Sequence, residues 1–173
     1  LTIRSGVSLL TSGTSVVKGI AMDAPGKTVK LLGNLKVEGT LELGEGILHV
    51  GNNNVKADKI IGASSTSYLL LPPPGSLTLT VPANATVNFP VGTMAGLADV
   101  DIIGLAMGHT SDDYTVSVVD KATIGAFSDP DPAGPRFAEF EWDITDMVMG
   151  GSNVNLVFKI PTDTKNVKYK KTG

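Results

Sequence analysis

Glycine recurs at short intervals through the segment 1–62 and divides it into short stretches in which apolar and polar residues alternate, such as 28–33, 34–39 and 40–44. Alternation with a period of two is typical of a β-strand. The pattern disfavours a helix, because glycine is too frequent for an apolar stripe at 3.6-residue spacing. Glycine and asparagine at the corners permit positive φ, so each strand can turn back over the last. A near-regular spacing of about a dozen residues or fewer favours a small β-solenoid, with a meander as the alternative.

The rest of the chain predicts a second β-rich unit. A serine- and threonine-rich break at 62–67 is followed by short alternating segments separated by glycine, proline and aspartate turns. About seven short strands of this kind are typical of a β-sandwich. The sequence therefore predicts an all-β protein. Residues 1–62 would form a glycine-cornered solenoid or meander, and residues 63–173 a β-sandwich with a basic C-terminal tail.

Composition excludes several classes of protein. With 42% hydrophobic residues the 173-residue chain is too apolar to be disordered, and no apolar run approaches the roughly 20 residues of a membrane-spanning helix. The absence of cysteine excludes disulfides, thiolate metal sites and a cysteine nucleophile. The chain begins at Leu1, which favours a removed leader or a piece of a longer protein.

Charge is distributed unevenly along the chain. Residues 1–62 carry a net charge of +2, residues 63–158 carry −9, and residues 159–173 carry +4. The total of −3 gives no general attraction to nucleic acid. Each face is either simply solvated, or the acidic body and basic ends favour head-to-tail contacts between copies.

No catalytic motif is recognisable. The two histidines, His49 and His109, lie far apart, and there is no nucleophile elbow, phosphate loop or zinc-ligand spacing. The chain is therefore predicted not to be an enzyme and to need no cofactor.

The most informative segment is 138–144. On a strand, Glu139, Glu141 and Asp143 face one way, while Phe140 and Trp142 face the core. This acidic face has three interpretations: a solvated surface, a cation or partner site, or a hydrolase that uses Glu139 and Glu141.

Acidic turns offer candidate ligands for a structural calcium ion. Calcium takes six to eight oxygens, usually gathered from carboxylates and carbonyls on loops. The candidates are Asp112 with Asp113, and Asp129 with Asp131. Ordinary turn acids are the alternative interpretation.

The order of these elements resembles a family of repeated all-β modules in secreted and cell-surface proteins of Bacteroidetes. The resemblance rests on the glycine-cornered segments from 1–3 to 41–44, the joint at 60–68, the Gly-Ser-Leu-Thr segment at 75–78, the Phe-Pro-Val-Gly turn at 89–92 and the Trp-Asp-Ile segment at 142–144. The triple proline at 72–74 and the insert at 128–135 depart from the family pattern. The resemblance implies an exported bacterial stalk, adhesin or matrix component that is not itself catalytic.

Together these observations predict an extracellular structural protein that forms a filament or adhesin stalk with copies of itself or with neighbouring modules. Unpaired backbone groups at strand edges would be completed by a strand from the next copy. The candidate assembly residues are Leu1, Thr2, Ile3, Val167, Lys168 and Tyr169. The alternative is a carbohydrate-binding or adhesive sandwich module attached to a larger secreted protein.

Overall fold

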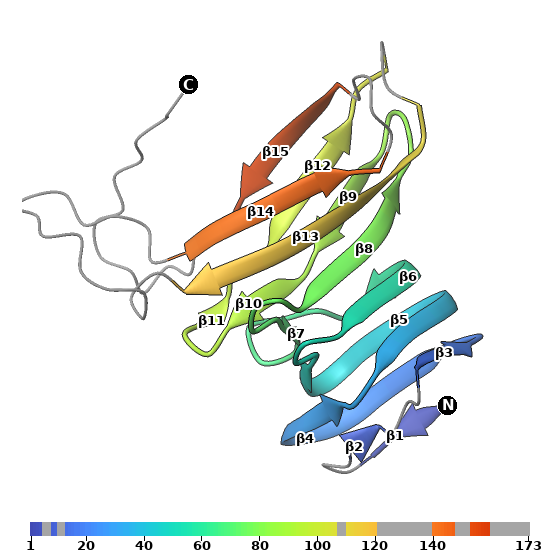
Figure 1. The fold of residues 1–173 in the computed structure, drawn as a ribbon, viewed down its shortest axis with the longest axis vertical. Coiled ribbons are helices and arrows are strands. Elements are labelled where there is room, and N and C mark those ends of the chain that lie inside the picture. Colours follow the sequence, from blue (N-terminus) through green and yellow to red (C-terminus); the bar gives the residue numbers. More distant parts are fainter. Residues whose placement is uncertain (5–7, 10–12, 107–109, 121–139, 148–152, 160–173) are drawn as a thin grey trace, which may run out of the picture.

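The computed structural model describes residues 1–4, 8–9, 13–106, 110–120, 140–147 and 153–159. All regular secondary structure in these residues is β-strand. A curled, largely parallel sheet forms a β-solenoid of about four turns, and antiparallel strands follow it (Figure 1). The prediction of an all-β chain with a solenoid at its beginning is confirmed.

The solenoid strands are β1 (Thr2–Ile3), β2 (Ser8–Leu9), β3 (Thr14–Val17), β4 (Ile20–Leu31), β5 (Asn34–His49), β6 (Asn54–Ile61), β7 (Leu69–Leu70), β8 (Ser76–Val81) and β10 (Val91–Thr93). The remaining strands are β9 (Thr86–Phe89), β11 (Gly96–Leu97), β12 (Val100–Gly104), β13 (Asp112–Asp120), β14 (Phe140–Asp146) and β15 (Val154–Phe158).

Each coil of the solenoid is longer than the spacing of its glycines suggests. Along one face, Thr2 pairs with Ala21, Ala21 with Glu42, and Glu42 with Ile61, so the chain passes the same point of the coil at positions 2, 21, 42 and 61. The expected spacing of about a dozen residues is therefore too short. The expected spacing is the distance between glycine-marked corners along the sequence. One coil contains more than one such corner, so its length is greater than that spacing.

Apolar columns inside the coils explain why these residues form this structure. Leu35, Val55 and Leu77 occupy the same position in successive coils and are at most 1% exposed. Because side chains alternate along each strand, the residues between them face solvent. One such outward ladder continues through polar contacts: Asn34 Oδ1 accepts a hydrogen bond from the Asn54 backbone at 2.9 Å, and Ser76 Oγ donates to Asn54 Oδ1 at 2.8 Å.

The parallel ladder continues past the expected domain boundary at residue 62. β7 pairs with β5, and β8 pairs with β6, both in parallel. β8 also pairs antiparallel with β13, so a single strand belongs to both parts of the molecule. The hydrogen-bonded sheet therefore has no break at residue 62. The division into folding units 1–62 and 63–173 stays a prediction.

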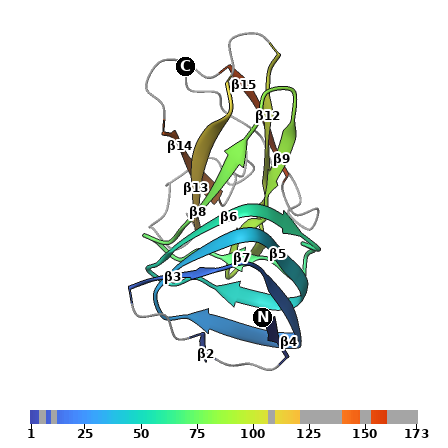
Figure 2. The ribbon, with the colours of Figure 1, turned by 90° about the vertical axis from the view of Figure 1, so that its right-hand side faces the viewer.

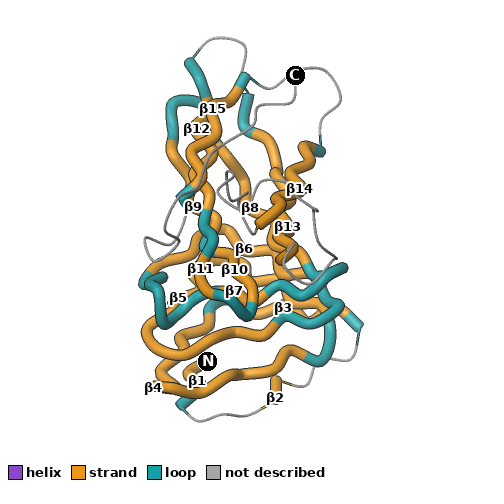
Figure 3. Tube along the Cα trace, turned by 90° about the vertical axis from the view of Figure 1, so that its left-hand side faces the viewer, coloured by secondary structure: helices purple, strands orange, loops and turns teal. Residues whose placement is uncertain are grey.

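Beyond the solenoid, two antiparallel layers face each other (Figures 1 and 2). One layer runs β8-β13-β14 and is continuous with the solenoid sheet, and the other is the three-stranded sheet β15-β12-β9. Phe89, Ile102 and Val116, which come from both layers, are completely buried in the core. The N-terminus lies in the coil farthest from these layers (Figures 2 and 3).

Gly46 shows why a glycine is needed at one corner. Its φ is +93°, and a Cβ built there would lie 2.4 Å from the Ala24 carbonyl oxygen of the preceding coil. Gly26 also has positive φ, at +64°, but open space surrounds its Cβ position. The two positions therefore separate the cost of the backbone conformation from the cost of close packing between coils.

We expect Gly46→Ala to lower the free energy of unfolding by about 3 kcal/mol or more, because it combines a left-handed backbone with a clash against backbone. Gly26→Ala, the matched control, should cost only about 1 kcal/mol. Urea unfolding followed by circular dichroism measures both. Equal losses in the two variants would contradict the close packing described at Gly46.

Candidate assembly surfaces

The first coil of the solenoid has an open outer edge. β1 pairs with β4 on one side, and in the described part of the chain no strand pairs with its other side. The Leu1 amino group donates a hydrogen bond to the Gly19 carbonyl at 3.1 Å, and the Leu1 carbonyl accepts one from the Ala21 backbone at 2.8 Å. Ile3 is only 5% exposed. Leu1, Thr2 and Ile3 are therefore the first rung of their own solenoid, and the surface they leave for a partner is the outer edge.

Thr2 presents its backbone groups to that outer edge. In a parallel ladder, the residue opposite Thr2 bonds to its two neighbours rather than to Thr2 itself. Ala21 is this opposite residue, and its N–H donates to the Leu1 carbonyl. The N–H and carbonyl of Thr2 consequently point away from β4, where an added strand would pair with them.

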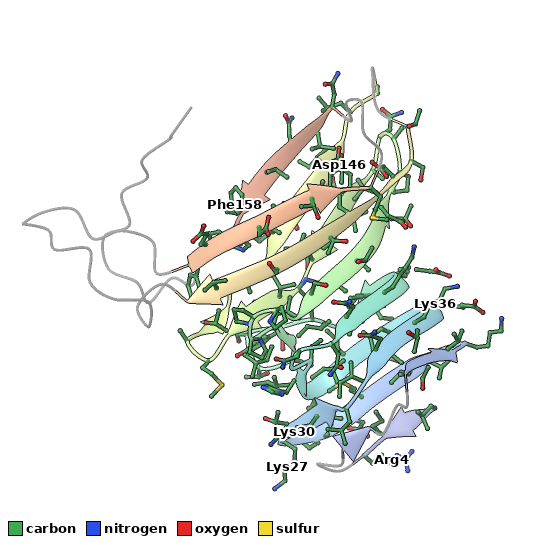
Figure 4. The ribbon with its side chains drawn as sticks, viewed as in Figure 1. Arg4, Lys27, Lys30, Lys36, Asp146 and Phe158 are labelled. Atoms are coloured by element: carbon green, nitrogen blue, oxygen red, sulfur yellow. The ribbon has the colours of Figure 1, made fainter. Side chains whose placement is uncertain are left out.

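The two ends of the molecule differ in charge. Arg4, Lys27 and Lys30 are exposed on the first two coils, at the end of the solenoid away from the antiparallel layers (Figure 4). Asp143 and Asp146 are exposed on β14, at the other end of the molecule. This arrangement places opposite charges on surfaces that would meet in a head-to-tail contact.

The structure places the described part of the predicted acidic face on the outer side of β14. Glu141 and Asp143 are exposed, whereas Phe140 is buried and Trp142 is partly buried. Trp142 donates its indole N–H at 2.7 Å to the carbonyl of Ala98, which lies in the connection between β11 and β12.

A groove of about 550 Å³ runs over the outer face of β8, β13 and β14. Pro73 and Pro74 are among its lining residues, together with hydroxyl side chains of Ser76, Thr115 and Ser117 and the acids of β14. Thr115 also shares a 2.8 Å hydrogen bond with Thr78 on the neighbouring strand. The lining offers hydrogen-bonding groups, and it also includes Trp142.

The two calcium candidates on β13 are engaged within the protein. Asp112 is 4% exposed and accepts a hydrogen bond from the Asp113 backbone at 2.7 Å. The Asp113 carboxylate forms an ion pair with Lys56 and accepts the Thr80 hydroxyl at 2.5 Å. The hydrogen bond from Lys56, followed by that from Thr80, holds the pKa of Asp113 below its usual range. The ion pair between Lys56 and Asp113 therefore links the solenoid strand β6 to β13.

A second polar cluster was not found by sequence reasoning. Asn88 Nδ2 donates to Asp99 at 2.7 Å and to Asp101 at 2.6 Å, and Lys159 Nζ bonds the same carboxylates at 3.1 and 2.9 Å. Burial acts to lower the pKa of Lys159, but its hydrogen bonds to Asp101 and Asp99 outweigh this, and the pKa is raised. The cluster joins the end of β15 to β12 and β9. Nothing local marks it, because Lys159 lies far along the sequence from both of the carboxylates that it joins.

An exposed ion-pair network links the first two coils. Glu38 accepts hydrogen bonds from Lys18 and Lys36, each at 2.9 Å. The hydrogen bonds from Lys18 and then Lys36 lower the pKa of Glu38 to about 2, and the bond with Glu38 raises the pKa of Lys18. Exposed pairs of this kind contribute little to stability.

Several candidate residues lie outside the described part of the chain. These are Asp129, Asp131, Glu139, Val167, Lys168 and Tyr169. Among the residues that the structure does describe, no group of three or more histidine, cysteine, aspartate or glutamate side chains is placed to hold a metal ion. The same residues contain no helix long and apolar enough to cross a membrane.

Comparison of the chain with protein-family models, with curated proteins and with solved structures finds no match.

We expect Asp113→Asn to make the free energy of unfolding depend less on pH in the acidic range. Because the folded state lowers the pKa of Asp113, the carboxylate stabilises the fold fully above the unfolded-state pKa of about 3.9, and this contribution is lost as the pH falls through the lowered pKa. The variant should lose up to about 1 kcal/mol at pH 7 and converge on the parent as the pH falls through the lowered pKa of Asp113. Urea unfolding between pH 2 and 7 measures this. The exposed Asp146→Asn is the control, and a parallel shift of the Asp113→Asn curve at every pH would contradict the argument.

Proposed function

We propose that this chain is a non-catalytic, extracellular structural protein, a subunit of a bacterial surface filament or adhesin stalk that associates head to tail. The observation that carries the proposal is the open outer edge of the first coil. A solenoid whose last coil is covered, and whose first coil has no further strand beside it among the described residues, presents a template for one more strand.

The two ends of the solenoid differ in what covers them. At one end, β8 passes directly into the antiparallel layers, which cover the last coil. At the other end, Thr2 presents backbone groups that no described strand pairs with, and Leu1 and Val16 of the first coil are 66% and 55% exposed. Backbone pairing together with apolar contact from a second copy would cover this end.

The charge pattern supports a head-to-tail arrangement. A basic solenoid end with Arg4 and Lys27 would approach the acidic β14 of the next copy. Such pairs steer encounter and orientation more than they add affinity. The assignment to a surface stalk rests in addition on the resemblance to Bacteroidetes modules, which motivates an extracellular location.

The groove over β8, β13 and β14 favours a second candidate function, a carbohydrate-binding module. Hydroxyl and carboxylate side chains such as Ser117 and Asp143 match the hydrogen-bonding needs of a sugar. Trp142 lines the groove but is partly buried, and its indole N–H is directed to the Ala98 carbonyl. Glycan-array binding that Asp143→Ala abolishes would support this second function.

We expect Thr2→Pro to weaken self-association by about tenfold or more, because proline removes the outward N–H while leaving the bonds between Leu1, Gly19 and Ala21 in place. Thr2→Val keeps the N–H and should associate like the parent. Sedimentation velocity over a concentration series measures the association constant, and negative-stain microscopy shows whether the products are ordered polymers.

Salt gives an independent check on this proposal. Raising the ionic strength from about 0.15 M to about 1 M shortens the screening length from about 8 Å to about 3 Å and should reduce the association of the parent. A chain that stays monomeric at every concentration and salt level would overturn the proposed function.

A further inference from the structure

The side of the molecule between β14 and β15 exposes an apolar seam. The rings of Trp142 and Phe158 meet across the two layers, with centroids 4.8 Å apart. Phe158 is nevertheless 39% exposed, and Leu156, which lies on the same side of β15, is 41% exposed. Ile144 of β14 is only partly buried. We call this set (Trp142, Ile144, Leu156 and Phe158) the β14/β15 seam.

Both layers end at this seam. β14 is the last strand of its sheet and β15 the last of the three-stranded sheet, so in the described part of the chain each has a strand partner on one side only. Figure 1 shows the two strands at the same side of the molecule, and Figure 4 marks Phe158 on β15 and Asp146 at the end of β14. The seam therefore combines an open backbone edge with an incompletely covered core.

The strand β14, which has one strand partner in the described part of the chain, also carries two distinct faces. Its inner face presents Trp142 and Ile144, and its outer face presents the exposed acids Glu141 and Asp143. A strand that pairs with β14 on its other side must place apolar side chains inward and is favoured by basic side chains outward.

One segment of the chain has this pattern. Residues 166–170 read Asn-Val-Lys-Tyr-Lys, which puts Val167 and Tyr169 on one face of a strand and Lys168 and Lys170 on the other. Within residues 159–173, which carry a net charge of +4, this is the segment where apolar and basic residues alternate. The acids of β14 belong to the part of the chain that carries −9.

We propose that the β14/β15 seam accepts residues 166–170 of a second copy as an added strand beside β14. Val167 and Tyr169 pack against Ile144, Leu156 and Phe158, and Lys168 lies beside Asp143. The inference rests on the proposed function, because it names the contact through which copies associate. It adds an interface separate from the outer edge of the first coil.

Cross-linking tests the contact directly, because the chain has no cysteine of its own. Full-length Leu156→Cys and full-length Tyr169→Cys are mixed and oxidised with copper phenanthroline, which joins two thiols as a disulfide. We expect covalent dimers that contain one molecule of each variant. The matched control is Met94→Cys, an exposed apolar position in the turn between β10 and β11 that belongs to neither proposed contact, mixed with Tyr169→Cys.

The same reaction separates the two ways in which the tail can reach the seam. In a double variant that carries both Leu156→Cys and Tyr169→Cys, contact between copies gives chains linked to one another at all but the lowest concentrations. A monomer with an internal disulfide would show that the seam takes the tail of its own chain and would overturn the proposal. Cross-linking no greater than in the Met94→Cys control would also overturn it.

A charge exchange tests the orientation of the strand. Lys168→Glu should lower the association constant severalfold, and Asp143→Lys should do the same. The double variant should recover most of the loss, because it restores opposite charges across the contact. Tyr169→Asp should lower association by about tenfold or more, whereas Tyr169→Phe should not. An unchanged association constant in Tyr169→Asp would contradict the packing of this side chain in the seam.

The outcomes distinguish this inference from the proposed function. If ordered polymers form but neither cross-linking nor the variants implicate the seam, the inference fails and the proposed function stands. If the full chain is monomeric under all conditions, both fail.

Discussion

The backbone ladder between successive coils is the interaction on which the rest of the structure depends. Each coil satisfies its hydrogen bonds and buries its apolar column only through the coil before it and the coil after it, as Leu35, Val55 and Leu77 show. A solenoid built in this way has no self-contained end. Each end coil therefore needs another element to pair with its outer edge. In this chain, the end without such an element among the described residues is the basis of the proposed function.

At one end of the solenoid, β8 connects the last coil to the antiparallel layers. It pairs in parallel with β6 of the solenoid and antiparallel with β13, so the last coil and the antiparallel layers share one sheet. The ion pair between Lys56 and Asp113 crosses the same junction. A continuous sheet braced in this way resists bending between the two parts, which suits the stalk role that we propose.

The two proposed contacts share one physical cause. The outer edge of β1 and the free edge of β14 each offer backbone groups beside incompletely covered apolar side chains, Leu1 and Val16 in the first case and Ile144 in the second. The charges around the two edges are opposite, with Arg4 near the first and Asp143 beside the second. Strand pairing at each edge would supply the affinity of association, and charge would favour a basic strand beside β14.

The sequence by itself determined the local features of this protein: the strand character of the chain, the need for glycine at corners such as Gly46, and the two-faced pattern of Phe140, Glu141 and Trp142. It did not reveal the length of a coil, because glycine marks every corner alike. Only the tertiary structure decided that Leu1–Ile3 forms the first rung of its own solenoid, that Lys159 joins Asp99 and Asp101, and that β14 and β15 leave a seam. Alternation and turn preference act between neighbouring residues, whereas strand partners are chosen between segments that lie far apart in the sequence, where no local pattern records the choice.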